Sequence, residues 1–187
     1  MAMRILAISG SLRDGSYNSL LLRAAEQQAP ADVQIELYDD LAQVPPFHGD
    51  RSTLAPVPEP VRDLQERIAN SDAVLIATPE YNGSIPGQLK NALDWASRPL
   101  ATSALRNKPV AVIGASTGAF GAVWAQAELR KVLGATGARV VDGELALGRA
   151  AERFGDDGRL REEAARDELR ELVWMLVDET VPLRAAA

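Results

Sequence analysis

The sequence predicts a doubly wound α/β domain, built on a parallel β-sheet with helices on both faces. Five short apolar runs with β-favouring residues alternate with five segments of helical periodicity. The runs that begin at Ala73 and Val110 are almost wholly apolar, as expected of strands whose two faces are both buried. The length of 187 residues fits one ordinary domain, so we expect residues 1–187 to form a single unit.

The expected strands and helices follow one another along the chain. The strands are predicted at residues 4–9, 33–38, 73–78, 110–115 and 139–141. The helices are predicted at residues 19–28, 59–70, 84–96, 120–133 and 160–180. Five parallel strands fit the order 2-1-3-4-5, but the alternation alone fits other orders as well.

Composition excludes several classes of function. The formal net charge of −6 argues against a nucleic-acid partner. The absence of cysteine excludes disulfides, thiolate catalysis and cysteine-ligated zinc, and it favours an intracellular protein. With a single histidine, His48, the chain has few of the ligands that metal sites commonly use, so we expect no metal site.

Nothing in the sequence suggests a membrane protein. The apolar run near the N-terminus is too short for a signal peptide, and a polar loop follows it at once. No run approaches the roughly 20 apolar residues that a spanning helix requires. We therefore expect a cytoplasmic protein with no membrane partner.

The loop after the first strand, "GSLRDGSYN", has the composition of an anion site. It is not a P-loop, because Ser16 stands where the lysine is required. It is not a dinucleotide fingerprint either, because Leu12 replaces the middle glycine. The loop and the following helix N-terminus suit a single terminal phosphate, with a serine-rich helix cap as the alternative. The candidate donors are Ser11, Arg13, Ser16 and Asn18.

Two later loops are expected at the same edge of the sheet, since the carboxyl ends of parallel strands meet there. "TPEYNGSIPGQLKNALDW" follows the third strand, and its Asn82-Gly83 pair is typical of a turn. "GASTGAFG" follows the fourth strand and contains the G-x-S-x-G pattern of hydrolase nucleophile elbows. The only histidine precedes Ser116, against the Ser-acid-His order, so we interpret the small residues as room for a flat ligand.

Together these loops resemble those of the NADPH-dependent FMN reductase family, a flavodoxin-like group with quinone- and chromate-reducing members. The similarity extends over residues 3–141, and "PEYNGSIPGQLKNALDW" is its most specific segment. The resemblance implies the flavodoxin-like strand order 2-1-3-4-5, FMN as cofactor and NADPH or NADH as co-substrate. It also implies that no side chain is catalytic, because the flavin carries the hydride chemistry.

By position, the resemblance implies a cofactor site in three parts. The phosphate would lie among Ser11, Arg13, Ser16 and Asn18, and Tyr17 would also bind the cofactor. The ribityl chain and the isoalloxazine ring would contact Pro79, Glu80, Tyr81, Asn82 and Gly83. The pyrimidine edge would lie at Ser116, Thr117 and Gly118. Residues 120–123 depart from the family pattern, which leaves the contacts to the second substrate open.

The resemblance further implies that helix 84–96 packs against another subunit, giving a homodimer or homotetramer. We expect a small-molecule acceptor, such as a quinone, free flavin, azo compound or metal oxyanion, and a ping-pong mechanism at one open flavin face. The alternatives are a flavodoxin-type electron carrier and a flavin-binding redox sensor without nicotinamide turnover. His48 and the segment 43–60, which holds five prolines, are left outside the site.

Overall fold

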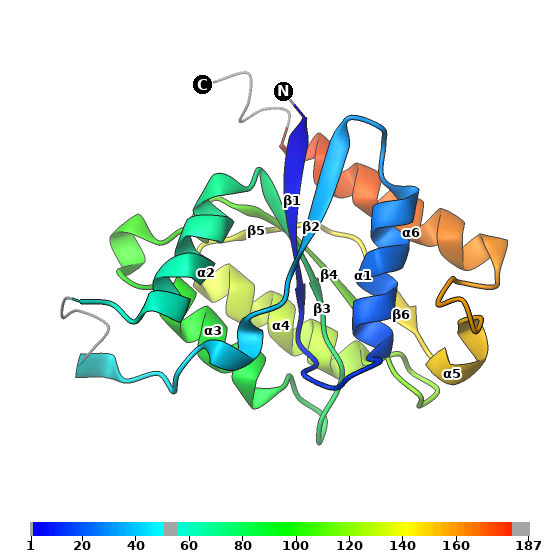
Figure 1. Cartoon of the computed structure of the whole chain (residues 1–187), viewed down its shortest axis with the longest axis horizontal. Helices are drawn as coiled ribbons and strands as arrows, with labels where there is room; N and C mark the ends of the chain where they lie inside the picture. Colours follow the sequence, from blue (N-terminus) through cyan, green and yellow to red (C-terminus); the bar gives the residue numbers. More distant parts are fainter. Residues whose placement is uncertain (1, 51–55, 181–187) are drawn as a thin grey trace.

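A parallel sheet forms the centre of the computed structural model, and helices cover both of its faces (Figure 1). The structure describes residues 2–50 and 56–180. Strands run in the order β2-β1-β3-β4-β5, and every pairing is parallel. Their bounds are β1 Met3–Ser9, β2 Val33–Tyr38, β3 Ala73–Ala77, β4 Pro109–Ala115 and β5 Arg139–Val140. This is the flavodoxin-like order, so the predicted fold class is confirmed.

Each predicted helix is present: α2 has the predicted bounds, and the other four differ at one or both ends. The bounds are α1 Tyr17–Gln28, α2 Glu59–Asn70, α3 Gly87–Ala96, α4 Val123–Ala135 and α6 Glu163–Asp178. Helix α3 begins three residues later than predicted because Pro86 occupies its N-cap position in an extended conformation. Within the described residues, no helix combines the length and apolar character needed to cross a membrane.

The sequence analysis missed two short elements after β5. Strand β6 (Leu145–Leu147) pairs with the last part of β4, whereas β5 pairs with its beginning. The two short strands therefore act as one interrupted edge strand beside β4. Helix α5 (Ala150–Arg153) follows β6. Elements of three and four residues are too short to show a period in the sequence.

Two apolar layers hold the sheet between its helices. One layer joins α1 and α6 to one face of the sheet, and the other joins α2, α3 and α4 to the opposite face. Strands β3 and β4 are buried along their whole length, as their continuous apolar sequences predicted.

Two polar side chains of α3 hold the segment that follows β2. The amide of Gln88 donates to the carbonyl oxygens of Leu41 and Val44, at 2.7 and 2.8 Å. The side-chain oxygen of Asn91 accepts from the backbone N–H of Phe47 at 2.6 Å. This binding orders the described beginning of the predicted long loop 43–60, of which residues 51–55 lie outside the described residues.

Trp95 completes this set one turn further along α3. Its indole Nε1 donates to the carbonyl oxygen of Pro45 at 2.9 Å, and the ring of Phe47 meets the indole edge-on, with centroids 5.1 Å apart. Positions 88, 91 and 95 lie on one helical face because they are three and four residues apart. We call Gln88, Asn91 and Trp95 the α3 clasp.

Candidate functional site

Three loops meet at the carboxyl edge of the sheet and border a cleft of about 420 Å³. They are the first loop (residues 10–16), the second loop (78–86) and the third loop (116–122), which follow β1, β3 and β4. The lining residues are Ser11, Arg13, Ser16, Tyr17, Asn18, Pro79, Glu80, Tyr81, Ala115, Ser116 and Thr117. The sequence analysis named all of them except Ala115. The volume falls within the roughly 300–1,000 Å³ typical of small-molecule sites.

The first loop places the N-terminus of α1 at the cleft. Ser16 is the N-cap, and its Oγ accepts from the backbone N–H of Asn18 at 3.2 Å. Gly10 donates its N–H to Ala77 of β3 at 2.8 Å, and a Cβ at position 10 would lie 2.9 Å from the Leu89 side chain. The loop is therefore packed closely against the sheet, and the positive end of the helix faces an incoming anion.

Arg13 gives the cleft a cation next to that helix end. Its guanidinium lies 5.6 Å from the centroid of the Tyr17 ring, in a cation–π contact. Tyr17 in turn stacks on Phe154, with centroids 5.8 Å apart and planes 21° from parallel. Among the described residues Arg13 has no carboxylate within ion-pair distance, so its charge is available for an anionic ligand.

Asn18 ties the first loop to the end of β4. Its Nδ2 donates to the carbonyl oxygen of Ala115 at 3.0 Å, and its Oδ1 accepts from the N–H of Ala115 at 2.9 Å. The side chain is 3% exposed. These two hydrogen bonds hold the two loops together, and the contact of Asn18 with a phosphate stays a prediction.

The second loop folds back on itself as a tight hairpin turn. Tyr81 and Ser84 exchange two backbone hydrogen bonds, of 2.9 and 3.1 Å. Between them, Asn82 and Gly83 have φ values of +54° and +76°, the pattern of a type I′ turn. The predicted turn is confirmed, but Asn82 and Gly83 form its tip and do not line the cleft, whereas Tyr81 does.

Glu80 joins the second loop to α4. Its Oε2 accepts from the backbone N–H groups of Trp124 and Ala125, each at 3.1 Å. Helix α4 needs this partner because its own N-cap residue, Ala122, has no side-chain hydrogen bond to offer. A carboxylate at a helix N-terminus also interacts favourably with the helix dipole. The sequence analysis missed this role, because the two segments are far apart along the chain.

The third loop rests on the β6–α5 segment. The backbone N–H of Ser116 donates to Leu147 at 3.0 Å, and Arg149 donates to Gly118 at 2.8 Å. The Oγ of Ser116 accepts from the N–H of Gly118 at 3.1 Å. Gly118 is exposed and is not among the residues that line the cleft, so its contact with the pyrimidine edge stays a prediction.

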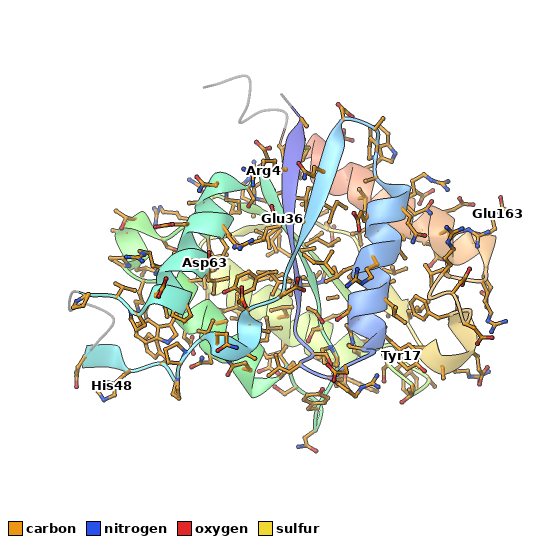
Figure 2. The ribbon with its side chains drawn as sticks, in the orientation of Figure 1. Arg4, Tyr17, Glu36, His48, Asp63 and Glu163 are labelled. Carbon is orange, nitrogen blue, oxygen red and sulfur yellow. The ribbon has the colours of Figure 1, made fainter. Side chains whose placement is uncertain are left out.

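His48 lies away from this site. Figure 2 shows it at the opposite side of the molecule from Tyr17. Its Nδ1 lies 3.8 Å from a carboxylate oxygen of Asp50, and both side chains are exposed. Ser116 therefore has no histidine base within reach, which removes the nucleophile-elbow alternative. Within residues 2–50 and 56–180 no group of three His, Asp or Glu side chains is placed to hold a metal ion.

This arrangement of loops agrees with comparisons to known proteins. The profile of the NADPH-dependent FMN reductase family matches residues 3–152. The chain belongs to this family. It is 42% identical to an NAD(P)H-dependent FMN reductase of Pseudomonas aeruginosa over 166 residues, which cover 88% of each protein. It is 45% identical to a 2-hydroxy-1,4-benzoquinone reductase of a Burkholderia species over 132 residues, 71% of this chain and 70% of the relative.

A solved structure also supports the assignment of the chain to this family. The flavoenzyme FerB of Paracoccus denitrificans, an NAD(P)H:(acceptor) oxidoreductase, superposes with a TM-score of 0.86 at 36% identity, covering 96% of this chain and 97% of FerB. The family resemblance and the predicted enzyme class, an NAD(P)H-dependent oxidoreductase with FMN as its cofactor, are confirmed.

Proposed function

We propose that this FMN reductase family member transfers reducing equivalents from NAD(P)H, through FMN held in the cleft, to a small-molecule acceptor such as a quinone. The observation that carries the proposal is the convergence of three loops on one cleft, with the unpaired Arg13 beside a helix N-terminus. The benzoquinone reductase among the relatives supports a quinone as acceptor.

The lining residues fit FMN. Ser11, Arg13, Ser16 and the N-terminus of α1 offer charge and donors suited to a phosphate. Tyr81 offers an aromatic face. We assign direct contact with the cofactor to the lining residues, and a loop-shaping role to Asn82 and Gly83.

When bound, FMN supplies the hydride chemistry, so the protein contributes binding and orientation. For a quinone the reaction balances as NAD(P)H + H⁺ + quinone → NAD(P)⁺ + hydroquinone. The tight packing of the first and third loops supplies a fixed wall for the cofactor. We place the reaction in the cytoplasm, where reduced nicotinamides are available.

The test is a turnover assay with the purified protein. We expect FMN to bind, and NAD(P)H to be oxidised at a rate that depends on added quinone. Flavin binding without NAD(P)H oxidation by any acceptor would favour the electron carrier or the redox sensor instead.

The order of substrates is a separate prediction. Because one open flavin face can hold one flat molecule at a time, nicotinamide and acceptor should take turns. Double-reciprocal plots should then give parallel lines as the fixed substrate varies, and anaerobic NAD(P)H alone should decrease the flavin absorbance. Intersecting lines would show that the two substrates bind together.

A homodimer or homotetramer is also proposed, with α3 as the contact. The large apolar residues of this helix, Leu89, Leu93 and Trp95, are buried in the chain's own core. An interface on α3 must therefore use its other face, where Lys90 and Asp94 pair at 2.7 Å. Light scattering at micromolar concentration should give two or four times the chain mass, and the mass of a single chain would contradict the proposal.

A further inference from the structure

Exposed apolar side chains gather around the cleft. Among the described residues, seven large apolar side chains are at least 40% exposed. Four of the seven lie on the cleft loops or in the first turn of α4, namely Leu12, Tyr81, Phe120 and Trp124. Clustered exposed apolar surface is unusual in a folded chain and typically marks a binding site.

Phe120 and Trp124 form a pair within this group. Phe120 is 64% exposed and Trp124 is 55% exposed. Their ring centroids lie 5.2 Å apart, with the planes at 67°. We call this edge-to-face pair the aromatic corner. The two rings pack in a geometry that aromatic pairs prefer, and most of their surface is still exposed to solvent.

The aromatic corner adjoins the cleft. The backbone N–H of Trp124 donates to the carboxylate of Glu80, which lines the cleft. Phe120 is three residues after Thr117, another lining residue. The backbone of both residues therefore lies next to residues that line the cleft, although neither Phe120 nor Trp124 is itself a lining residue.

The backbone around Phe120 is closely packed against the β6–α5 segment. Gly121, at φ +59°, lies so close to Ala146 that a Cβ there would be 2.2 Å from its carbonyl carbon. A Cβ on Gly148 would be 2.1 Å from the carbonyl oxygen of Ala119. The backbone of the third loop is therefore packed closely next to Phe120, whose ring is 64% exposed.

We propose that the aromatic corner binds flat aromatic acceptors at the mouth of the cleft, and thereby favours quinones with fused rings over acceptors without an aromatic plane. The inference rests on the proposed function and specifies its acceptor. Two exposed rings that already pack edge to face offer aromatic surface on which a planar ligand can stack. Phe120 belongs to residues 120–123, where this chain departs from the pattern expected of its family, and Trp124 follows directly.

The experiment compares two acceptors, a naphthoquinone and ferricyanide, with Phe120→Ala and Trp124→Ala. We expect the ratio of kcat/KM for the naphthoquinone to that for ferricyanide to fall about three- to tenfold in each variant, the range for loss of an aromatic pair. Trp124→Phe retains a ring and should keep most of the ratio. Trp174→Ala removes a similarly exposed tryptophan from α6 and should leave the ratio unchanged.

Three outcomes would overturn the inference. An unchanged ratio in Phe120→Ala and Trp124→Ala would show that the corner does not select the acceptor. A fall in the molar mass of either variant, measured by light scattering, would show that the corner is a contact between subunits. If the unmodified chain oxidises NAD(P)H with neither acceptor, the proposed function itself fails, a result distinct from the first two.

Discussion

Residues 79–84 and residues 87–95 are adjacent in the most specific segment of the sequence, yet they serve different parts of the molecule. Pro79, Glu80 and Tyr81 line the cleft. The α3 clasp, Gln88, Asn91 and Trp95, binds the backbone of residues 41–47 and makes no contribution to the cleft wall. A motif that identifies a family of enzymes thus combines a binding part with a structural part. The two parts should respond differently to mutation.

The largest expected effect falls on the structural part. Trp95→Ala removes a side chain that is 1% exposed, together with its hydrogen bond to Pro45. We expect the free energy of unfolding to fall by about 3–5 kcal/mol, the usual cost of truncating a buried tryptophan. Chemical denaturation of the flavin-free protein measures it.

The same variant tests the separation between the two parts. The fraction of Trp95→Ala that remains folded should bind FMN with the affinity of the parent chain, as measured by fluorescence titration at low temperature. Trp95→Phe, which retains most of the ring volume, should lose less stability. A large loss of FMN affinity in the folded variant would mean that the clasp shapes the cleft after all.

In the first loop we expect a smaller effect, and we expect it mainly on FMN affinity and not on stability. Arg13→Ala removes a charged partner of the proposed phosphate, and charge-assisted hydrogen bonds are worth about 1.5–3 kcal/mol. FMN should therefore bind about 10- to 100-fold more weakly. The unfolding free energy of the flavin-free protein should fall by no more than about 1 kcal/mol, since the exposed Arg13 loses only its cation–π contact with Tyr17. Riboflavin, which lacks the phosphate, should bind both proteins equally. Unchanged FMN affinity would show that the phosphate lies elsewhere.

The smallest effect is expected at Glu80, which both lines the cleft and caps α4. A substitution there should therefore affect both binding and stability. Glu80→Ala is expected to lower the free energy of unfolding by about 1 kcal/mol, as for the loss of a helix cap. Glu80→Gln retains an acceptor oxygen and should recover part of that loss. Thermal unfolding of the two variants measures the difference, and equal stability of Glu80→Ala and the parent would contradict the capping role.

The sequence predicted the sheet order once the resemblance was added, and most of the lining of the cleft. It succeeded there because the first loop and the Asn82-Gly83 turn carry local chemistry. It could not reveal the bond between Glu80 and α4 or the one between Asn18 and Ala115, because each joins segments distant along the chain. Nor could it show which chain covers the apolar face of α3, since a buried face has the same sequence pattern whether the chain's own core or another subunit covers it.

The two hydrogen bonds between Asn18 and Ala115 also bear on how the chain assembles. They join residues 97 positions apart, and the third loop then depends on Leu147, further along again. Contacts of such long range form late, since the loop between them must close first. During synthesis the chain must therefore extend beyond β6 before the cleft exists. FMN captured from solution then becomes a reporter of completed folding, which a nascent chain lacking its last third would not acquire.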